Sequence, residues 1–291
     1  MKQGVAIIGL INVTLIWGGG FVASDLALDS LLPFQIMAVR FGLATLFMGV
    51  ISLPALKSIS KDELKAGSLM GISLFLGFAF QTVGLQYTTP SKSAFLTALY
   101  VVIVPFIAFV FLRKRVGRKG IIGAILSILG VALLSLNADL SFGFGDVLTI
   151  LCAISFAFQI FFTGLFSQTC RVSVLNFLQM AASFLMSLCG MVLFGETSFQ
   201  FERTGVFSIL YLAVLSTMVC YLLQTACQKY IDETKSAIIL SMESVFGTLF
   251  SILILHEYLT FRMLVGCAVI LAAVVISNLP EAETKQSAES V

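Results

Sequence analysis

Two ionisable residues lie deep inside long apolar stretches of this sequence. Glu243 is eight residues beyond Lys235, and Arg40 is seven residues into the stretch that begins at Pro33. At 1.5 Å of rise per helical residue, these offsets correspond to depths of about 12 Å and about 10 Å in a bilayer. Ionisable groups at such depths are costly, so each is a candidate for binding a small molecule or carrying a proton.

The two residues allow different interpretations. For Glu243 we expect contact with a substrate or transfer of a coupling proton, and the alternative is a buried carboxyl group that makes only a structural hydrogen bond. The Arg40 side chain either extends toward the membrane surface or pairs with a carboxylate such as Glu243, and a structural anchoring role is favoured.

Uncharged polar side chains in the same stretches could line a wet cavity, and each could instead form a hydrogen bond between helices. Trp17, the only tryptophan, lies too deep for the interfacial aromatic belt, so we expect it in a cavity wall or in ordinary packing. The candidate substrate-binding residues are Trp17, Arg40, Gln81, Tyr100, Gln159, Gln179, Tyr221, Gln224 and Glu243.

Metal and enzyme chemistry find little support in the sequence. The six cysteines form no C-x-x-C pair and no Cys/His cluster, so we expect no metal site, no disulfide framework and no cofactor. An intramembrane enzyme would need a base or a ligand set beside a buried nucleophile, and the single histidine does not supply it. We therefore expect no enzymatic activity.

The elements that must position these residues are membrane spans. The chain is 59% hydrophobic and 11% charged, with a mean hydropathy of +1.05, which is more apolar surface than a soluble domain of 291 residues could cover. Stretches of roughly 20 apolar residues cross a bilayer. Ten are predicted, at 4–24, 33–53, 66–87, 92–112, 118–136, 145–166, 173–194, 205–228, 234–255 and 261–279. The polar residues 280–291 are predicted to be a disordered tail.

The spans form two copies of one unit, because a set of residues recurs 143 positions later. Gln81, Thr82, Tyr87, Lys92, Ser93 and Ala94 recur as Gln224, Thr225, Tyr230, Lys235, Ser236 and Ala237. Five spans per copy, at 4–136 and 145–279, require the second copy to enter the bilayer upside down. The predicted fold is therefore an all-α polytopic membrane protein of ten transmembrane helices in two inverted five-helix repeats, an arrangement typical of transporters.

The positive charges predict the orientation. If the N-terminus is cytoplasmic, most Lys and Arg residues fall in cytoplasmic segments, and the outside loops hold only Lys92, Arg203 and Arg262. This bias predicts a protein of the cytoplasmic membrane with both termini in the cytoplasm, and it accounts for the net charge of +2 without a nucleic-acid partner. Lys92 and Lys235 would then lie at opposite faces, where we treat them as gate candidates.

Several phrases of the sequence resemble the EamA-type members of the drug/metabolite transporter superfamily. They are Ile16-Trp17-Gly18, Gly84-Leu-Gln-Tyr-Thr-Thr, Ala94-Phe-Leu-Thr-Ala-Leu-Tyr-Val-Val, Ser241-Met-Glu-Ser and Leu255-His-Glu-Tyr-Leu-Thr. The resemblance implies ten helices, with spans one, three, four, six, eight and nine around a central cavity and spans five and ten at the periphery. Ser244 stands where the family often has a proline, so the sequence lacks the residue expected to bend span nine.

The resemblance also implies a carrier, commonly an exporter of amino acids or other small metabolites. We therefore expect a secondary transporter that moves a small-molecule substrate by alternating access, with the lipid bilayer as its surroundings and proton coupling through Glu243 as a hypothesis. The alternative is a passive channel or a lipid-moving protein without a saturable cycle. No feature of the sequence indicates an oligomeric state.

Overall fold

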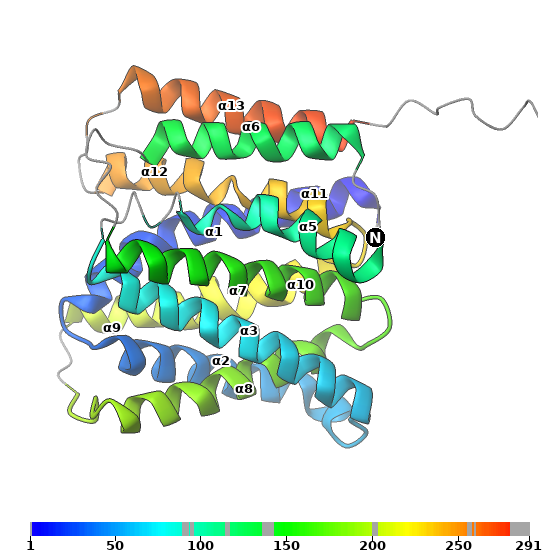
Figure 1. The fold of residues 1–291 in the computed structure, drawn as a ribbon. Coiled ribbons are helices and arrows are strands. Elements are labelled where there is room, and N and C mark those ends of the chain that lie inside the picture. Colours follow the sequence, from blue (N-terminus) through cyan, green and yellow to red (C-terminus); the bar gives the residue numbers. More distant parts are fainter. Residues whose placement is uncertain are drawn as a thin grey trace, which may run out of the picture.

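The fold is described from a computed structural model, which covers residues 2–88, 93, 96–113, 117–135, 143–199, 203–254, 258 and 260–279. Within these ranges every regular element is a helix and no strand occurs. Figure 1 shows the helices lying roughly parallel to one another in a single bundle.

The first part of the chain forms α1 (Gln3–Leu28), α2 (Pro33–Leu56), α3 (Lys61–Leu85), α5 (Tyr100–Leu112) and α6 (Arg118–Ser135). The second part forms α7 (Phe144–Phe166), α8 (Val172–Leu193), α9 (Arg203–Leu210), the π-helix η1 (Tyr211–Val219), α10 (Cys220–Gln228), α11 (Glu233–Leu240), α12 (Glu243–Ile254) and α13 (Phe261–Asn278).

Eight helical segments of the described chain are long and apolar enough to cross a membrane. They are α1, α2, α3, α7, α8, the segment Gly205–Gln228, the segment Glu233–Ile254 and α13. The predicted spans 92–112 and 118–136 are the other two: α5 is a shorter apolar helix, and α6 has 18 residues that begin with Arg118 and Lys119. The multi-pass helical fold is thus confirmed, and the count of ten remains a prediction.

Local signals explain where several helices begin and end. Ser60 precedes α3 and accepts a hydrogen bond from the backbone N–H of Glu63, whose carboxylate in turn accepts from the backbone N–H of Ser60. This capping box satisfies two of the free N–H groups at the helix start. Proline stands at the first position of α2, where its missing N–H costs nothing. Gly195, with φ of 71°, follows the end of α8 in the left-handed conformation that glycine adopts freely.

Close packing between the helices depends on small residues. A Cβ atom added to Gly18 of α1 would lie 2.7 Å from the backbone nitrogen of Gly247 in α12, and one added to Gly71 of α3 would lie 2.7 Å from the carbonyl oxygen of Gln179 in α8. Such backbone proximity provides the van der Waals contact that holds helices together in lipid. The helices α6 and α13 also pack on each other, and Figure 1 shows them side by side at one edge of the bundle.

Spans four and nine are interrupted at positions that match in the 143-residue repeat. The α12 helix begins at Glu243 after a turn at Ser241 and Met242, and α5 begins at Tyr100 after a turn two residues long. Span nine is therefore interrupted although it lacks the family proline at Ser244. The Ser241 hydroxyl donates to the carbonyl oxygen of Ile238 at 2.7 Å, a side-chain contact that competes with regular helix hydrogen bonding.

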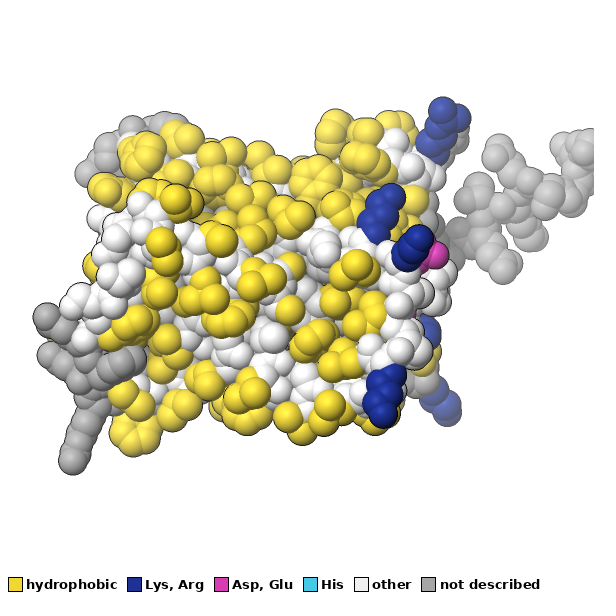
Figure 2. Space-filling view, turned by 90° about the horizontal axis from the view of Figure 1, so that it is seen from below, with side chains coloured by type: hydrophobic (Ala, Val, Ile, Leu, Met, Phe, Trp, Pro, Cys, Tyr) yellow, Lys and Arg dark blue, Asp and Glu magenta, His cyan; other side chains and the backbone are white. Residues whose placement is uncertain are grey.

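The outer surface has two chemically different regions. Figure 2 shows hydrophobic side chains along the body of the bundle, and Lys and Arg side chains gathered at one end. The N-terminus lies at this same end, which we call the basic end (Figure 1). Large apolar side chains such as Phe106, Leu185 and Val192 are more than 60% exposed, as expected where lipid is the solvent.

Candidate functional site

A cavity lies between helices of both halves of the chain and leaves about 60 Å³ open to the centre of a water-sized sphere. Its lining comprises Trp17, Gly20, Phe21, Ser24, Arg40, Phe78, Gln81, Thr82, Leu85, Thr97, Tyr100, Phe156, Gln159, Ile160, Leu212, Ser216, Tyr221 and Glu243. The contributions of α1 and α3 come from the later parts of these helices, which begin at the basic end. The cavity therefore extends from the middle of the bundle toward the opposite end.

Seven of the nine predicted cavity residues line this space. They are Trp17, Arg40, Gln81, Tyr100, Gln159, Tyr221 and Glu243. The other two, Gln179 and Gln224, are fully buried and outside the lining. Both take part in hydrogen bonds between helices, and their role as cavity residues stays a prediction.

Glu243 contacts its own counterpart in the repeat. The hydroxyl of Tyr100 donates to Oε1 of Glu243 at 3.2 Å, and both side chains are buried against the cavity. Each residue is the first of a half-helix, Tyr100 of α5 and Glu243 of α12. The partial positive charge of a helix N-terminus favours a carboxylate at this position.

Arg40 joins α2 to the π-helix. Its Nε donates to the hydroxyl of Thr217, its Nη2 donates to the hydroxyl of Ser216 at 3.3 Å, and its guanidinium lies 4.0 Å from the centre of the Phe78 ring. The side chain is only 4% exposed, so it does not extend to the membrane surface. Between the described side chains of Arg40 and Glu243 there is no ion pair, and the role of Arg40 stays a prediction.

The π-helix η1 organises this side of the cavity. The Trp17 indole N–H donates to the carbonyl oxygen of Ser216 at 2.8 Å, and the Tyr211 hydroxyl donates to the carbonyl oxygen of Ile16 at 2.7 Å. Long π-helices are rare and occur mainly at functional sites. Ser216 and Thr217 are not among the residues predicted from the sequence, although two adjacent hydroxyl residues in an apolar span are a signal that points to them.

Aromatic rings form one wall of the cavity. The rings of Trp17 and Tyr221 are 5.2 Å apart, and Phe78 lies 5.1 Å from Phe156 and 6.4 Å from Tyr221. Two of the three predicted aromatic residues, Trp17 and Tyr221, belong to this cluster. It gives the cavity an apolar surface beside the polar groups of Arg40 and Glu243.

A buried network of amide side chains lies between α7, α8 and α10. Gln224 donates to Oε1 of Gln159 at 3.3 Å, and Gln159 donates to the Thr163 hydroxyl at 3.0 Å and to Oε1 of Gln179 at 3.4 Å. Gln179 donates to Oδ1 of Asn176 at 2.6 Å. The network extends from Gln159 in the cavity wall toward the basic end.

Further contacts close the basic end beyond this network. Gln228 donates to the carbonyl oxygen of Ile160 at 3.2 Å, and Gln168 donates to the carbonyl oxygen of Lys229 at 3.1 Å. These bonds tie the end of α7 to the end of α10. The cavity is thus separated from the basic end by packed and hydrogen-bonded side chains.

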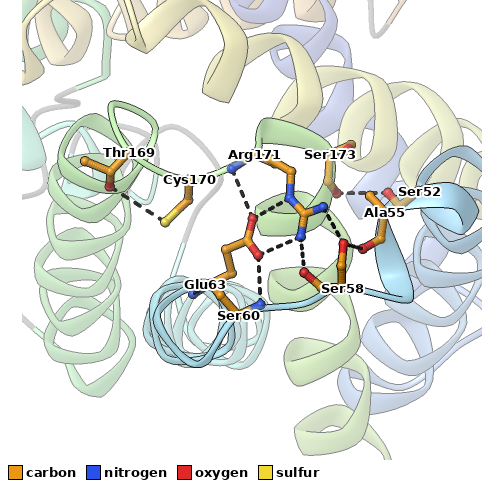
Figure 3. A network of polar contacts seen from close by, with 9 residues as sticks. All are labelled: Ser52, Ala55, Ser58, Ser60, Glu63, Thr169, Cys170, Arg171 and Ser173. Atoms are coloured by element: carbon orange, nitrogen blue, oxygen red, sulfur yellow. Dashed lines mark hydrogen bonds and ion pairs between the residues drawn. The ribbon is translucent and has the colours of Figure 1, made fainter.

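An ion pair joins the two halves at the basic end (Figure 3). Arg171, just before α8, places Nε 2.7 Å from Oε1 of Glu63 and Nη2 2.7 Å from Oε2, and it also donates to the hydroxyl and carbonyl oxygens of Ser58. Its backbone N–H donates to Oε1 of Glu63 at 3.3 Å. An arginine–carboxylate ion pair is strongest when two nitrogens contact the two carboxylate oxygens, as they do here. The hydrogen bond to Glu63 raises the pKa of Arg171 above its ordinary value.

A carboxylate makes the corresponding contact at the opposite end. Glu196, just after α8, accepts from the backbone N–H groups of Phe34 at 2.7 Å and Gln35 at 3.3 Å, at the start of α2. Partial burial raises the pKa of the Glu196 carboxyl above its usual range, and the two backbone hydrogen bonds act in the opposite direction. Each half of the chain therefore supplies a carboxylate to the helix start of the other half.

Of the two predicted gate residues, Lys235 is the one that the structure describes. Lys235 lies near the start of α11, 3.9 Å from the carboxylate of Asp232, and does not belong to the cavity lining. Lys92 lies outside the described residues, so its role as a gate remains a prediction. In the described ranges, no group of three or more His, Cys, Asp or Glu side chains is arranged to hold a metal ion.

Comparison with known proteins places this geometry in a family. The EamA-like transporter family matches residues 4–136 and again residues 143–279. A protein of Archaeoglobus fulgidus named an uncharacterized transporter is 37% identical over 96% of this chain and 87% of its own length. The uncharacterized transporter YoaV of Bacillus subtilis is 24% identical over 93% of this chain and 96% of its own length.

A solved crystal structure supports the fold. It superposes with a TM-score of 0.81 at 16% identity, covering 96% of this chain and 97% of the other. Two matches to one family, which together include every residue of the cavity lining and both interrupted spans, show that this chain belongs to the EamA-like transporter family.

Proposed function

We propose that this protein is a secondary transporter that moves a small metabolite across the cytoplasmic membrane by alternating access. The observation that carries the proposal is the cavity, which lies between helices of both halves and extends toward one end only. A carrier needs a site that is open to one side and closed to the other. The hydrogen-bonded contacts of Gln159, Gln224 and Gln228 supply the closure at the basic end.

Equivalent residues of the two halves have different surroundings, as a two-state carrier requires. Gln81 lines the cavity, whereas its repeat partner Gln224 is fully buried in the amide network. Oε1 of Gln224 is buried and has no hydrogen-bond partner within the described part of the chain. An unpartnered buried acceptor costs free energy, which favours a second conformation in which Gln224 lines the cavity and Gln81 is buried.

The proposed topology is ten spans in two inverted repeats, with the basic end in the cytoplasm. The clustering of Lys and Arg at that end supports it (Figure 2). In this orientation the cavity extends toward the outside. Reporter fusions at Lys92 and Lys235 would test the arrangement, since the proposal requires opposite sides of the membrane and a shared side would overturn it.

We propose that the protein exports an amino acid or a similar metabolite. The energy for export comes from protons, and Glu243 is the residue that carries them. Glu243 is buried in the cavity wall and its partner, Tyr100, is uncharged, so the carboxyl group can gain or lose a proton without breaking an ion pair. Its place at an interrupted helix connects this change to the backbone of span nine.

The transport proposal is tested in two steps. Comparison of metabolites released by cells with and without this chain identifies a substrate, and proteoliposomes loaded with that substrate then measure uptake of its labelled form. Saturable uptake that accelerates with substrate inside the vesicles supports a carrier. Unsaturable flux without this acceleration would instead support the alternative of a passive channel, and movement of labelled lipid would support a lipid-moving protein.

A further inference from the structure

We propose that Arg40 is the docking point for a carboxylate group of the transported molecule, so that the substrates of this protein are small metabolites bearing one carboxylate and an apolar body. The inference rests on the proposed function, because it takes the cavity to be the transport site. It adds the chemical class of the substrate and the residue that selects it.

Among the described residues, Arg40 is a buried cation without a buried counter-ion. Its partners in the described structure are the neutral hydroxyl groups of Ser216 and Thr217 and the faces of the Phe41 and Phe78 rings. Within the described chain, no hydrogen bond engages its third nitrogen, Nη1. A guanidinium that is 4% exposed in a membrane protein is costly unless a negative charge approaches it, and the cavity is the space from which a ligand can do so.

The protein itself does not provide that charge from the cavity wall. Glu243 is the one acidic residue of the lining, and it accepts from Tyr100 while making no ion pair with Arg40. Thr217 and Ser216 hold Nε and Nη2 and so fix the plane of the guanidinium. A fixed, planar guanidinium matches the geometry of a carboxylate or a phosphate. The single positive charge of Arg40 balances the one negative charge of a carboxylate and not the two of a phosphate dianion, which favours the carboxylate.

The aromatic wall beside Arg40 determines the rest of the ligand. Phe78 supports the guanidinium from one side and also packs against Tyr221, which in turn packs against Trp17. A ligand whose carboxylate reaches Arg40 therefore places its body near these rings, where apolar groups are favoured. Trp17 is the only tryptophan of the chain, so its fluorescence reports occupation of this cavity.

The test uses pairs of probes that differ only at the carboxylate. Purified full-length protein is titrated with 3-phenylpropionate and 3-phenylpropanamide, and with L-leucine and L-leucinamide, while the fluorescence of Trp17 is followed. The carboxylate of each pair is expected to bind about tenfold or more tightly than its amide, because a charge-assisted contact to Arg40 is lost in the amide. Arg40→Gln should abolish this preference, and Arg40→Lys should retain part of it because the charge remains without the two-point geometry.

Arg262→Gln is the matched control, since Arg262 is exposed on α13 and should leave the preference unchanged. Equal binding of carboxylate and amide to the wild-type protein, no binding of either carboxylate, or an intact preference in a folded Arg40→Gln variant would each overturn the inference. None of these results would remove the carrier proposal, which fails only if counterflow of the metabolite found by the cell screen is not saturable.

Discussion

Tyr100 and Glu243, which occupy equivalent positions 143 residues apart, form a hydrogen bond of 3.2 Å between the first residues of two half-helices. A contact between equivalent residues of two repeats lies where the repeats meet. The two interrupted spans therefore come together at the wall of the cavity.

Replacement of Glu243 by glutamine separates proton coupling from substrate binding. Glutamine preserves the size of the side chain but does not bind or release a proton at physiological pH. Glu243→Gln should therefore retain exchange of labelled for unlabelled substrate and lose net transport driven by a pH gradient. Both rates are measured in the same proteoliposomes. Tyr100→Phe serves as the control for the hydrogen bond alone and should cost about 1 kcal/mol of stability with coupling retained. Net transport at the normal rate in Glu243→Gln would exclude a proton role.

The alternating-access proposal predicts unequal reactivity for two equivalent glutamines. In a variant without the six native cysteines, Gln81→Cys should react readily with a membrane-impermeant thiol reagent added outside, and Gln224→Cys should react slowly, since Gln224 is fully buried. Saturating substrate on one side should change the two rates in opposite directions. If the two labelling rates are equal, or if substrate changes them in the same direction, the two glutamine positions do not alternate between the cavity lining and the buried network.

The ion pair of Arg171 and Glu63 should stabilise the contact between α3 and α8. Arg171→Gln and Glu63→Gln are each expected to lower the thermal unfolding midpoint in detergent, and the double variant should lose less than the sum of the two. High salt should weaken the effect of either change, because the Arg171 side chain is 42% exposed. Lys57→Gln, in the same region of the chain, is the control. Strict additivity of the two single variants would show that the pair is not energetically coupled.

Glycine at position 71 should be required for the packing of α3 on α8. In Gly71→Ala the new methyl group would lie 2.7 Å from the carbonyl oxygen of Gln179 and 2.6 Å from the Cβ of Ala182, so the helices must separate. We expect a loss of about 1–3 kcal/mol in the free energy of unfolding, measured by denaturation in mixed micelles. Gly4→Ala, which meets no atom within 4 Å, should change stability by less than about 0.5 kcal/mol. If Gly71→Ala lowers the free energy of unfolding by no more than Gly4→Ala does, then α3 and α8 accommodate the new methyl group and the glycine is not required.

The helical architecture could be predicted because it follows from composition and length alone. A long apolar run must satisfy its backbone hydrogen bonds internally in lipid, so it must be helical, and eight of the predicted spans meet the structural criteria. The interruption of span nine was not predictable in this way. Its expected signal was a proline, and the chain instead uses a turn at Ser241 and Met242 whose energy depends on tertiary packing.

The candidate site was predictable in its residue types but not in its geometry. Arg40 and Glu243 could be selected because ionisable groups in apolar spans are costly, and both line the cavity. Their lack of mutual pairing depends on the π-helix, which brings Ser216 and Thr217 to Arg40 and has no local sequence signature. Gln81 and Gln224 are the same residue in the same repeat context, so their different burial reflects the conformation of the bundle rather than the sequence around them.

Each half of the chain contacts a carboxylate of the other half, and this arrangement has a consequence for biosynthesis. Glu63 emerges from the ribosome long before Arg171, and the start of α2 precedes Glu196 by more than half the chain. The first half therefore enters the membrane with Glu63 lacking its ion-pair partner and with the backbone N–H groups of Phe34 and Gln35 lacking the Glu196 carboxylate. It reaches its final packing only after translation has passed residue 196. Truncated nascent chains that stop short of this point would be expected to remain loosely packed and to be preferred substrates for membrane quality-control proteases.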